Sequence, residues 1–160
     1  MTTIAPTGSI SLIADCSPGI EPLYGVQELR RVMDGVVLTS LHPAFVRRAR
    51  AFGLNLASLR PDQAAHPSIQ HVTHTPEELR RIFVTAHDVS PEHHVRMQAI
   101  FQRYSDSGVS KIINLPATAT KAEVAAAFLL AHQLGCEGLT VYRTDSRERQ
   151  VVSCSLSHPC

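Results

Sequence analysis

The C-terminal half of the sequence contains the feature that most constrains the fold, a predicted strand, helix and strand joined by short connections. Val109–Leu115 and Leu139–Tyr142 are short apolar segments rich in β-branched residues, as strands usually are. Between them, Thr120 and Glu123 have the spacing of a capping box, in which the two side chains satisfy N–H groups at the start of a helix. The helix that begins there would end at Gly135. A strand, helix and strand in this order require parallel pairing and a right-handed crossover, so we predict an α/β fold.

Helix-start signals and breaking residues divide the rest of the chain into alternating helices and extended segments. Residues 23–41 are mixed apolar with several β-branched valines, which indicates extended structure, and residues 54–75 have the composition of a loop. We predict a helix from Pro43 to a stop at Gly53, a short helix from Pro76 to about Phe83, and a helix that begins at Ser90-Pro-Glu92. Two predicted helices have apolar residues at helical spacing, Met97, Ile100, Phe101 and Tyr104 on one and Val124, Ala127, Phe128 and Ala131 on the other.

The segment Ala5-Pro-Thr-Gly-Ser-Ile-Ser11 has the composition of an anion-binding loop. Gly8 lets the backbone approach a ligand closely, and a helix over residues 9–14 would direct unpaired N–H groups and the positive end of its dipole at a phosphate. Thr and Ser before an apolar run are also ordinary helix N-caps, and on the local pattern alone that structural role is the commoner one. The candidate phosphate-binding residues are Pro6, Thr7, Gly8, Ser9 and Ser11.

Composition narrows the classes of partner. The chain has 160 residues, of which 44% are hydrophobic and 18% charged, with a net charge of +1. This length suits one domain, and the near-neutral balance gives no electrostatic signature of nucleic acid or of an acidic membrane. No apolar run approaches the roughly 20 residues of a membrane span, and no signal peptide is recognisable. We therefore expect a cytoplasmic chain with reduced thiols, without nucleic acid or a membrane as partner.

Five motifs follow one another between about residues 4 and 152. They are Ala5-Pro-Thr-Gly-Ser-Ile-Ser11 with Gly19-Ile-Glu-Pro22, Arg30-Arg-Val-Met-Asp-Gly35, Thr85-Ala-His-Asp-Val-Ser-Pro-Glu-His-His-Val-Arg-Met-Gln98, Ser110-Lys-Ile-Ile-Asn-Leu-Pro116 and Leu134-Gly-Cys-Glu-Gly-Leu-Thr-Val-Tyr-Arg143. In sequence and in order, these motifs resemble those of the catalytic chain of the adenosylcobalamin-dependent, class II ribonucleotide reductases.

The resemblance implies a fold and a function. The fold would be an incomplete C-terminal segment of a ten-stranded α/β barrel, with a single partial-barrel domain over residues 1–152 and a tail over 153–160. The opening loop would grip the phosphates of a ribonucleotide. The complete enzyme would bind adenosylcobalamin and convert ribonucleotides to 2′-deoxyribonucleotides for DNA synthesis. The chain alone is not expected to hold the cofactor.

The chemistry of the family depends on a radical cysteine in a loop of N-x-C-x-E type, and this sequence has no such loop. We therefore assign no catalytic residue to the chain, expect it to be inactive alone, and expect a separately encoded remainder of the reductase to complete it. The alternative is a decayed or repurposed fragment, either a phosphate- or nucleotide-binding module or a chain without activity.

The cysteines outside that context need their own interpretation. Cys16 and Cys136 match framework cysteines of the family, which we expect to be buried by packing. Cys154 and Cys160 have a C-x5-C spacing, and the family ends in a redox pair, but that pair lies much further downstream, so we take the spacing as coincidence. Tyr142 stands where radical-transfer tyrosines occur in some relatives, and we expect it to pack at the end of the barrel.

The nine histidines do not predict a metal site. His71 and His74 lie in the predicted loop without cysteine or carboxylate neighbours, and the adjacent His93 and His94 point about a hundred degrees apart on a helix. Zinc usually needs three or four well-placed ligands, so we assign no metal. His87 and Asp88 lie within the Thr85–Gln98 motif, and we assign them no role.

An incomplete barrel has a physical consequence. A parallel strand normally has neighbours on both edges, and an open edge or apolar face promotes association. The strands near 109–115 and 138–142, joined by a helix over 120–134, would leave at least one edge uncovered. We expect the chain to bind the missing barrel portion or to self-associate.

Overall fold

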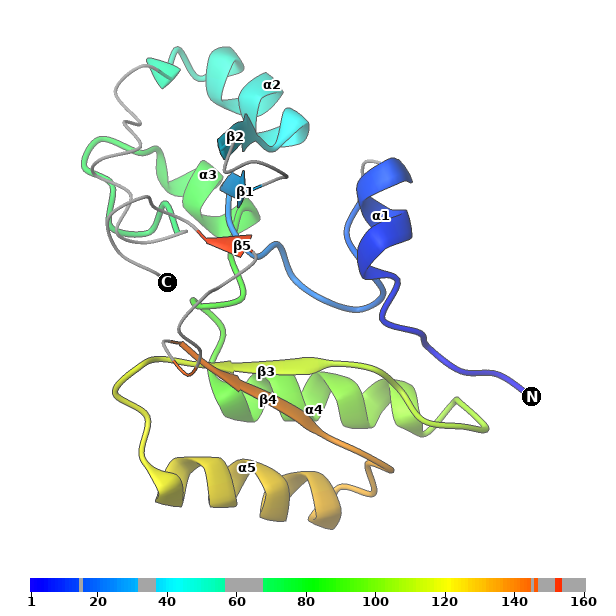
Figure 1. Cartoon of the computed structure of the whole chain (residues 1–160). Helices are drawn as coiled ribbons and strands as arrows, with labels where there is room; N and C mark the ends of the chain where they lie inside the picture. The colour runs from blue at the N-terminus through cyan, green and yellow to red at the C-terminus, as the bar shows by residue number, and fades with distance from the viewer. Residues whose placement is uncertain (15, 32–36, 57–67, 145, 147–151, 154–160) are drawn as a thin grey trace. The chain divides into compact units, whose positions relative to one another are not determined.

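A computed structural model describes residues 1–14, 16–31, 37–56, 68–144, 146 and 152–153 (Figure 1). The chain divides into two compact units. Unit 1 comprises residues 1–22 and 89–143, and unit 2 comprises residues 23–88 and 144–160. The prediction of one domain over residues 1–152 stays a prediction. Cys154, Cys160 and the rest of the tail beyond Ser153 lie outside the described residues.

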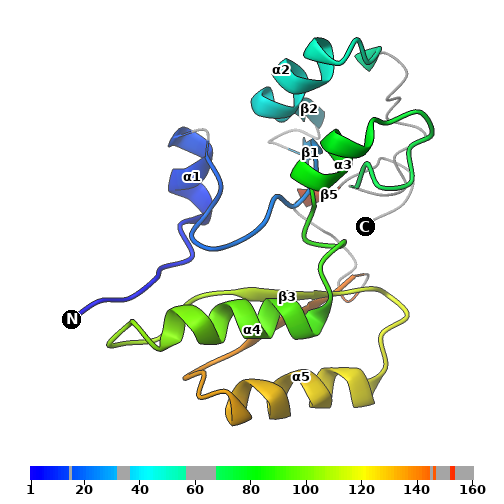
Figure 2. The same cartoon turned by 180° about the vertical axis from the view of Figure 1, so that it is seen from behind.

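Unit 1 contains the predicted parallel strand pair. Strand β3 (Ile112–Leu115) pairs in parallel with β4 (Thr140–Arg143), and Ile113 is opposite Val141. Helix α5 (Lys121–Gln133) connects the two strands, as the sequence predicts, and helix α4 (Pro91–Gln102) packs against both β3 and α5 (Figures 1 and 2). The small core of this unit consists of Val95, Ile113, Ala127 and Ala131.

The predicted capping box at the start of α5 is confirmed. The carboxylate of Glu123 accepts hydrogen bonds from the backbone N–H of Thr120 at 2.7 Å and from its hydroxyl at 2.8 Å. In return, the Thr120 hydroxyl oxygen accepts from the Glu123 N–H at 3.3 Å. The bond from the Thr120 backbone and that from its side chain lower the pKa of Glu123. Gly135, just beyond α5, has φ +76°, the left-handed conformation that ends helices.

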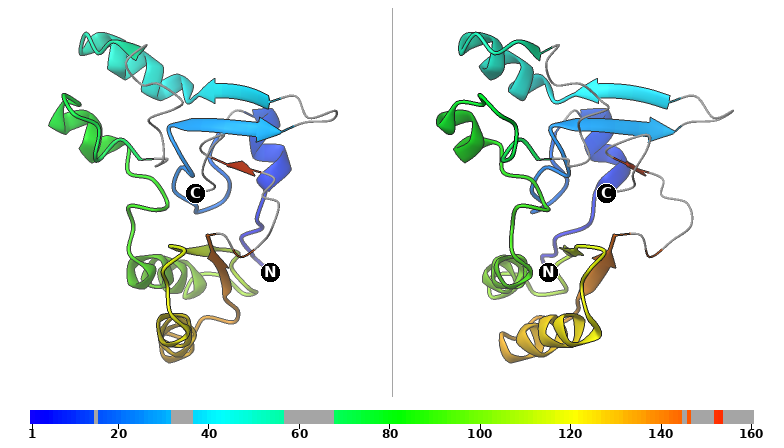
Figure 3. Two further views of the ribbon diagram at one scale, coloured as in Figure 1. Left: turned by 60° about the vertical axis from the view of Figure 1, so that its left-hand side comes forward. Right: turned by 90° about the vertical axis from the view of Figure 1, so that its left-hand side faces the viewer.

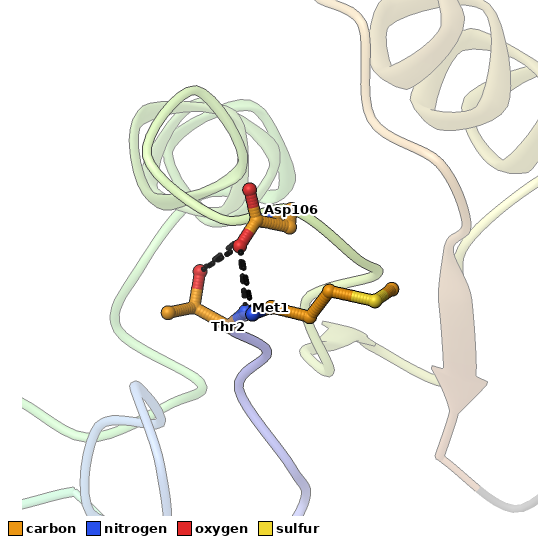
Figure 4. A network of polar contacts seen from close by, with 3 residues as sticks. All are labelled: Met1, Thr2 and Asp106. Atoms are coloured by element: carbon orange, nitrogen blue, oxygen red, sulfur yellow. Dashed lines mark hydrogen bonds and ion pairs between the residues drawn. The ribbon is translucent and has the colours of Figure 1, made fainter.

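The N-terminal segment runs alongside the residues that lead into β3. Ile4 forms a parallel bridge with Val109, and its carbonyl accepts from the Ser110 N–H at 2.8 Å. One carboxylate oxygen of Asp106 accepts from the Thr2 N–H at 2.7 Å and from the Thr2 hydroxyl at 3.2 Å (Figure 4). The Met1 ammonium lies 3.6 Å from the same oxygen. Residues 2–4 thus add a third parallel segment beside the residues preceding β3.

Helix α4 begins as predicted, but its apolar stripe is exposed. Ser90 caps it through a hydrogen bond from the His93 N–H, while Met97, Ile100, Phe101 and Tyr104 are all exposed. The buried face of α4 is more polar, because its side chains form hydrogen bonds with backbone groups. The Gln98 amide donates to the carbonyls of Val109, at 3.1 Å, and Gly138, at 2.7 Å. On α5, Ala127 and Ala131 are buried as the pattern predicts, whereas Phe128 is exposed.

Unit 2 is built on antiparallel strands. Strand β1 (Gln27–Arg31) lies between β2 (Val37–Leu41) and the short β5 (Val152–Ser153), with both pairs antiparallel (Figure 3). Extended structure within residues 23–41 is therefore confirmed, although the alternating pattern did not predict antiparallel pairing. The predicted helices are present as α2 (Pro43–Ala51) and α3 (Glu77–Ile82).

The core of unit 2 is larger and more aromatic than that of unit 1. The rings of Phe45 and Phe83 meet edge to face with centroids 5.2 Å apart. They pack with Val26, Ala49, Ile69 and Leu79. Residues 54–56 and 68–75 contain no α-helix or strand, in agreement with the predicted loop, and residues 57–67 lie outside the described part.

The described strands form a three-stranded and a two-stranded sheet, so the α/β class is confirmed, while the ten-stranded barrel stays a proposal. In the described ranges, no helix is both long and apolar enough to cross a membrane.

Candidate phosphate-binding loop

Helix α1 (Gly8–Ala14) begins at Gly8, one residue earlier than predicted, so that Gly8, Ser9 and Ser11 of the candidate loop lie in the helix. Its first backbone hydrogen bond runs from the Ser11 N–H to the Thr7 carbonyl at 2.9 Å. The N–H groups of Gly8, Ser9 and Ile10 precede that bond, so they have no acceptor within the helix. Thr7 has φ +47°, a left-handed conformation that is uncommon for a residue with a branched side chain. The sharp turn at Thr7 therefore directs the chain into the helix.

Four of the five candidate residues are accessible at this turn. Pro6, Gly8 and Ser9 are exposed and Thr7 is half-buried. A Cβ added at Gly8 would meet no atom within 4 Å, so the space beside its backbone is open. Ser11 differs, because it is buried and its hydroxyl donates to the Gly8 carbonyl at 2.9 Å. In this arrangement, Ser11 stabilises the first turn and leaves Thr7 and Ser9 to offer hydroxyl donors.

The helix start also lacks a negative charge of its own. Helices α3, α4 and α5 each have one or two glutamates in the first turn, whereas α1, like α2, has no acidic residue there. Carboxylates in a first turn interact with the positive end of the helix dipole and with the unpaired N–H groups. At α1 these groups are left available to an external anion.

Both ends of the loop are attached to the residues that precede and begin β3. The incoming end is the parallel segment that includes Ile4. At the returning end, Gly19 has φ +50°, and a Cβ there would lie 3.1 Å from the Ala5 carbonyl oxygen. Glu21 follows, with one carboxylate oxygen 2.6 Å from the Lys111 ammonium and the other accepting from the Ile112 N–H at 2.6 Å.

Sequence reasoning did not identify Glu21 and Lys111 as a pair. They lie 90 positions apart, and neither has a local pattern that predicts the contact. The only available signal was that each lies within a motif that the resemblance singles out.

The prediction that Cys16 is buried is wrong. Its side chain is exposed, and the apolar side chains of Ile10 and Ile13 on the neighbouring α1 are exposed too. Among the described side chains of this segment, none forms an apolar core into which the thiol could pack. Cys136 agrees better with the prediction, because it is partly buried against the core of unit 1. Burial raises the pKa of the Cys136 thiol. Tyr142, on β4, is half-buried.

The contacts of the histidines and of the Thr85–Gln98 motif are hydrogen bonds and a ring contact with neighbouring residues. Among the described residues, no group of three or more His, Cys, Asp and Glu side chains is arranged to hold a metal ion. His93 Nδ1 lies 2.8 Å from the Ser90 hydroxyl, and the His87 ring contacts the Tyr24 ring edge to face. One Asp88 carboxylate oxygen accepts from both the N–H and the hydroxyl of Thr85, each at 2.8 Å. The Thr85–Asp88 part of the motif is thus a hydrogen-bonded turn.

Comparison with known proteins gives consistent matches. The family described as "Ribonucleotide reductase, barrel domain" matches residues 1–142. A vitamin B12-dependent ribonucleoside-diphosphate reductase of Thermoplasma acidophilum is 45% identical over 152 residues, which cover 95% of this chain and 20% of that protein. A protein of the same description from Mycobacterium tuberculosis is 40% identical over 159 residues, covering 99% of this chain and 23% of that one.

A solved structure extends the likeness to the fold. The class Id ribonucleotide reductase alpha subunit of Actinobacillus ureae superimposes with a TM-score of 0.71 at 22% identity, covering 88% of this chain and 26% of that chain. The chain therefore spans about a fifth to a quarter of the length of these similar proteins.

Proposed function

This chain belongs to the ribonucleotide reductase barrel-domain family, and from that premise we propose that it is a C-terminal catalytic-barrel segment of a vitamin B12-dependent reductase. Its contribution is the loop that binds the phosphates of a ribonucleotide. The observation that carries this proposal is the arrangement at the start of α1. The backbone at Gly8 is open, Thr7 and Ser9 are accessible, and the first turn of the helix has no acidic residue.

The loop would hold the substrate by its phosphates and leave the ribose for chemistry elsewhere. The N–H groups of Gly8, Ser9 and Ile10 and the hydroxyls of Thr7 and Ser9 are donors, which is what phosphate oxygens require. Fixing the phosphates orients the substrate, and such positioning supplies much of the rate enhancement in enzymes. Pro6 sets the entry to the turn, and Ser11 holds its first helical turn through Gly8.

The complete reaction replaces the ribose 2′-hydroxyl with hydrogen. A ribonucleotide and a dithiol give a 2′-deoxyribonucleotide, a disulfide and water. Adenosylcobalamin supplies radical chemistry when bound to the complete enzyme. The open surface around Gly8, with Ile10 and Ile13 exposed beside it, does not enclose a corrin ring, so we assign the cofactor to the remainder of the reductase. The radical cysteine belongs to that remainder too.

The partner would be the rest of the barrel, in the cytoplasm. The exposed apolar side chains in unit 1 support this, because a concentration of large apolar side chains in contact with solvent often marks an interface. They are Met97, Ile100 and Phe101 on α4, Tyr104 just beyond its end, Ile112 on β3, and Phe128 and Leu129 on α5. Self-association would cover the same surface if the remainder is absent.

A second candidate is a stand-alone phosphate- or nucleotide-binding module. It is favoured by the apolar cluster that each unit forms by itself. The module would be supported if the chain is a monodisperse monomer that unfolds cooperatively and does not bind the rest of the reductase.

The test of the loop is titration of the purified chain with inorganic phosphate and with ADP by calorimetry. Gly8→Val should weaken binding at least about tenfold, a change of about 1.4 kcal/mol, because the branched side chain occupies the space beside the backbone. Gly138→Val is the matched control, since a Cβ at Gly138 also meets no atom within 4 Å and the residue lies outside the loop. Equal affinity of Gly8→Val and wild type would refute the phosphate-binding role.

Activity gives a separate test. Incubated with ribonucleotide, adenosylcobalamin and a dithiol, the chain alone should form no deoxyribonucleotide. Product formation by this chain alone would overturn the assignment of the radical cysteine to the remainder of the reductase.

A further inference from the structure

An ion pair inside unit 1 joins the returning end of the phosphate-binding loop to β3. The Lys111 side chain is 1% exposed and its ammonium lies 2.6 Å from one oxygen of Glu21, whose side chain is 18% exposed. The other Glu21 oxygen accepts from the N–H of Ile112, the first residue of β3. Both carboxylate oxygens are therefore engaged, which fixes the side chain in one orientation.

The opposite end of the loop is attached to the same stretch of chain. The Thr2 carbonyl accepts from the Ser107 N–H at 3.0 Å, and the Ile4 carbonyl accepts from the Ser110 N–H. Close packing of Gly19 beneath the Ala5 carbonyl brings the two ends together. The loop that contains α1 is thus held at both ends along residues 107–112.

Buried ion pairs are not explained by stability alone. Replacing such a pair with apolar residues of similar volume is often neutral or stabilising, because desolvation of the charges offsets their attraction. A pair that fixes one geometry can instead specify position. Here the geometry that it specifies is that of the loop carrying Thr7, Gly8 and Ser9.

We propose that Glu21 and Lys111 are positioning residues that hold the phosphate-binding loop in its ligand-binding conformation. The proposal deepens the proposed function and rests on it. Neither side chain contacts the phosphate; both act through the returning end of the loop. If the released loop adopts the binding conformation about one-tenth of the time, the apparent affinity for phosphate falls about tenfold.

The test uses the double variant Glu21→Gln/Lys111→Met, which removes both charges and keeps an amide oxygen to accept from Ile112. The matched control is Glu92→Gln/Arg96→Met, because Glu92 and Arg96 form an ion pair of 2.7 Å in the same unit with both side chains more than half exposed. Two measurements are made on each full chain, the affinity for inorganic phosphate and the hydrogen exchange of amides in residues 8–14.

The double variant should bind phosphate about tenfold more weakly and exchange faster in residues 8–14. Exchange in β3 and α5 should remain as in wild type, and the melting temperature should stay within about 4 °C of the wild-type value. The control should change neither quantity. Wild-type exchange and affinity in the double variant would overturn the proposal. If wild type itself binds no phosphate, the proposed function fails, and the exchange measurement still decides whether the pair holds the loop. If the double variant does not fold, Glu21→Asp, which keeps both charges and shortens the side chain by one methylene, is measured in its place with the same two readouts and the same outcomes.

Discussion

The Glu21–Lys111 pair makes a quantitative prediction about stability. Glu21→Gln alone should destabilise the chain strongly, because the Lys111 ammonium would remain buried opposite a neutral amide. Breaking a buried pair by removing one partner typically costs about 3–5 kcal/mol. Because the Glu21 side chain is 18% exposed, water can reach part of the site, and we expect a cost near the lower end, about 3 kcal/mol.

The other corners of the double-mutant cycle follow from the same geometry. Lys111→Met leaves a carboxylate that still accepts from Ile112 and still reaches water, so its cost should be smaller, about 1–2 kcal/mol. The double variant Glu21→Gln/Lys111→Met buries no charge and should lie within about 1 kcal/mol of wild type. If the double variant is between about 0 and 1 kcal/mol less stable than wild type, the coupling free energy between the two positions is about 3–5 kcal/mol, at or above the upper end of the range for residues in contact.

Urea denaturation followed by circular dichroism at 25 °C measures each corner of this cycle. High salt should leave the coupling largely unchanged, since buried charges are screened little. The exposed pair Glu92–Arg96 should give a coupling of only about 0.3–0.5 kcal/mol. A cost below about 1 kcal/mol for Glu21→Gln, or strictly additive single changes, would refute the reasoning.

Four further predictions concern other parts of the chain. Thr120→Ala should cost about 1 kcal/mol by removing the cap of α5, and an unchanged urea midpoint would contradict this. The pKa of Glu123 is lower in the folded chain than its ordinary value of 4.5, so its contribution to stability is present above pH 4.5 and declines as the pH falls through the folded-state pKa. The loss of stability at acidic pH should therefore be smaller in Glu123→Gln than in wild type, and parallel pH profiles of the two proteins would contradict this prediction. Iodoacetamide should modify the exposed Cys16 faster than Cys136, whose thiol pKa is raised by burial, and peptide mass spectrometry showing the reverse order would contradict the assigned exposures. Ile100→Lys on α4 should reduce any concentration-dependent association seen by light scattering, whereas unchanged association would place the interface elsewhere.

Local signals predicted the helices well. Caps and stops are set by residues close in sequence, so Pro43, Ser90 and Thr120 placed the starts of α2, α4 and α5 within one residue. The parallel pairing of β3 with β4 was also predictable, because a short connection through a helix permits no other arrangement.

Burial and distant contacts were less accessible to sequence reasoning. The apolar stripe of α4 is exposed because the opposite face is buried, and on that face the Gln98 amide donates hydrogen bonds to two backbone carbonyls. The spacing of apolar residues does not predict such hydrogen bonds. Cys16 is exposed, as are the apolar side chains of Ile10 and Ile13 on the preceding helix. The residues of the loop were identified from sequence, but the Glu21–Lys111 contact that holds its returning end depends on tertiary structure.

The discontinuity of unit 1 has a consequence for the order of folding. Residues 1–22 leave the ribosome before residues 23–88, yet the groups that hold them lie at 106–112, after that stretch. At roughly 5–20 residues per second, the 90 positions from Glu21 to Lys111 take about 5–20 s to synthesise. During that time the loop has neither of its supports, and contacts so distant in sequence are slow to form because a long chain must be closed first. Residues 1–22 are therefore synthesised well before residues 106–112, and their loop acquires its native structure only after those residues have been made.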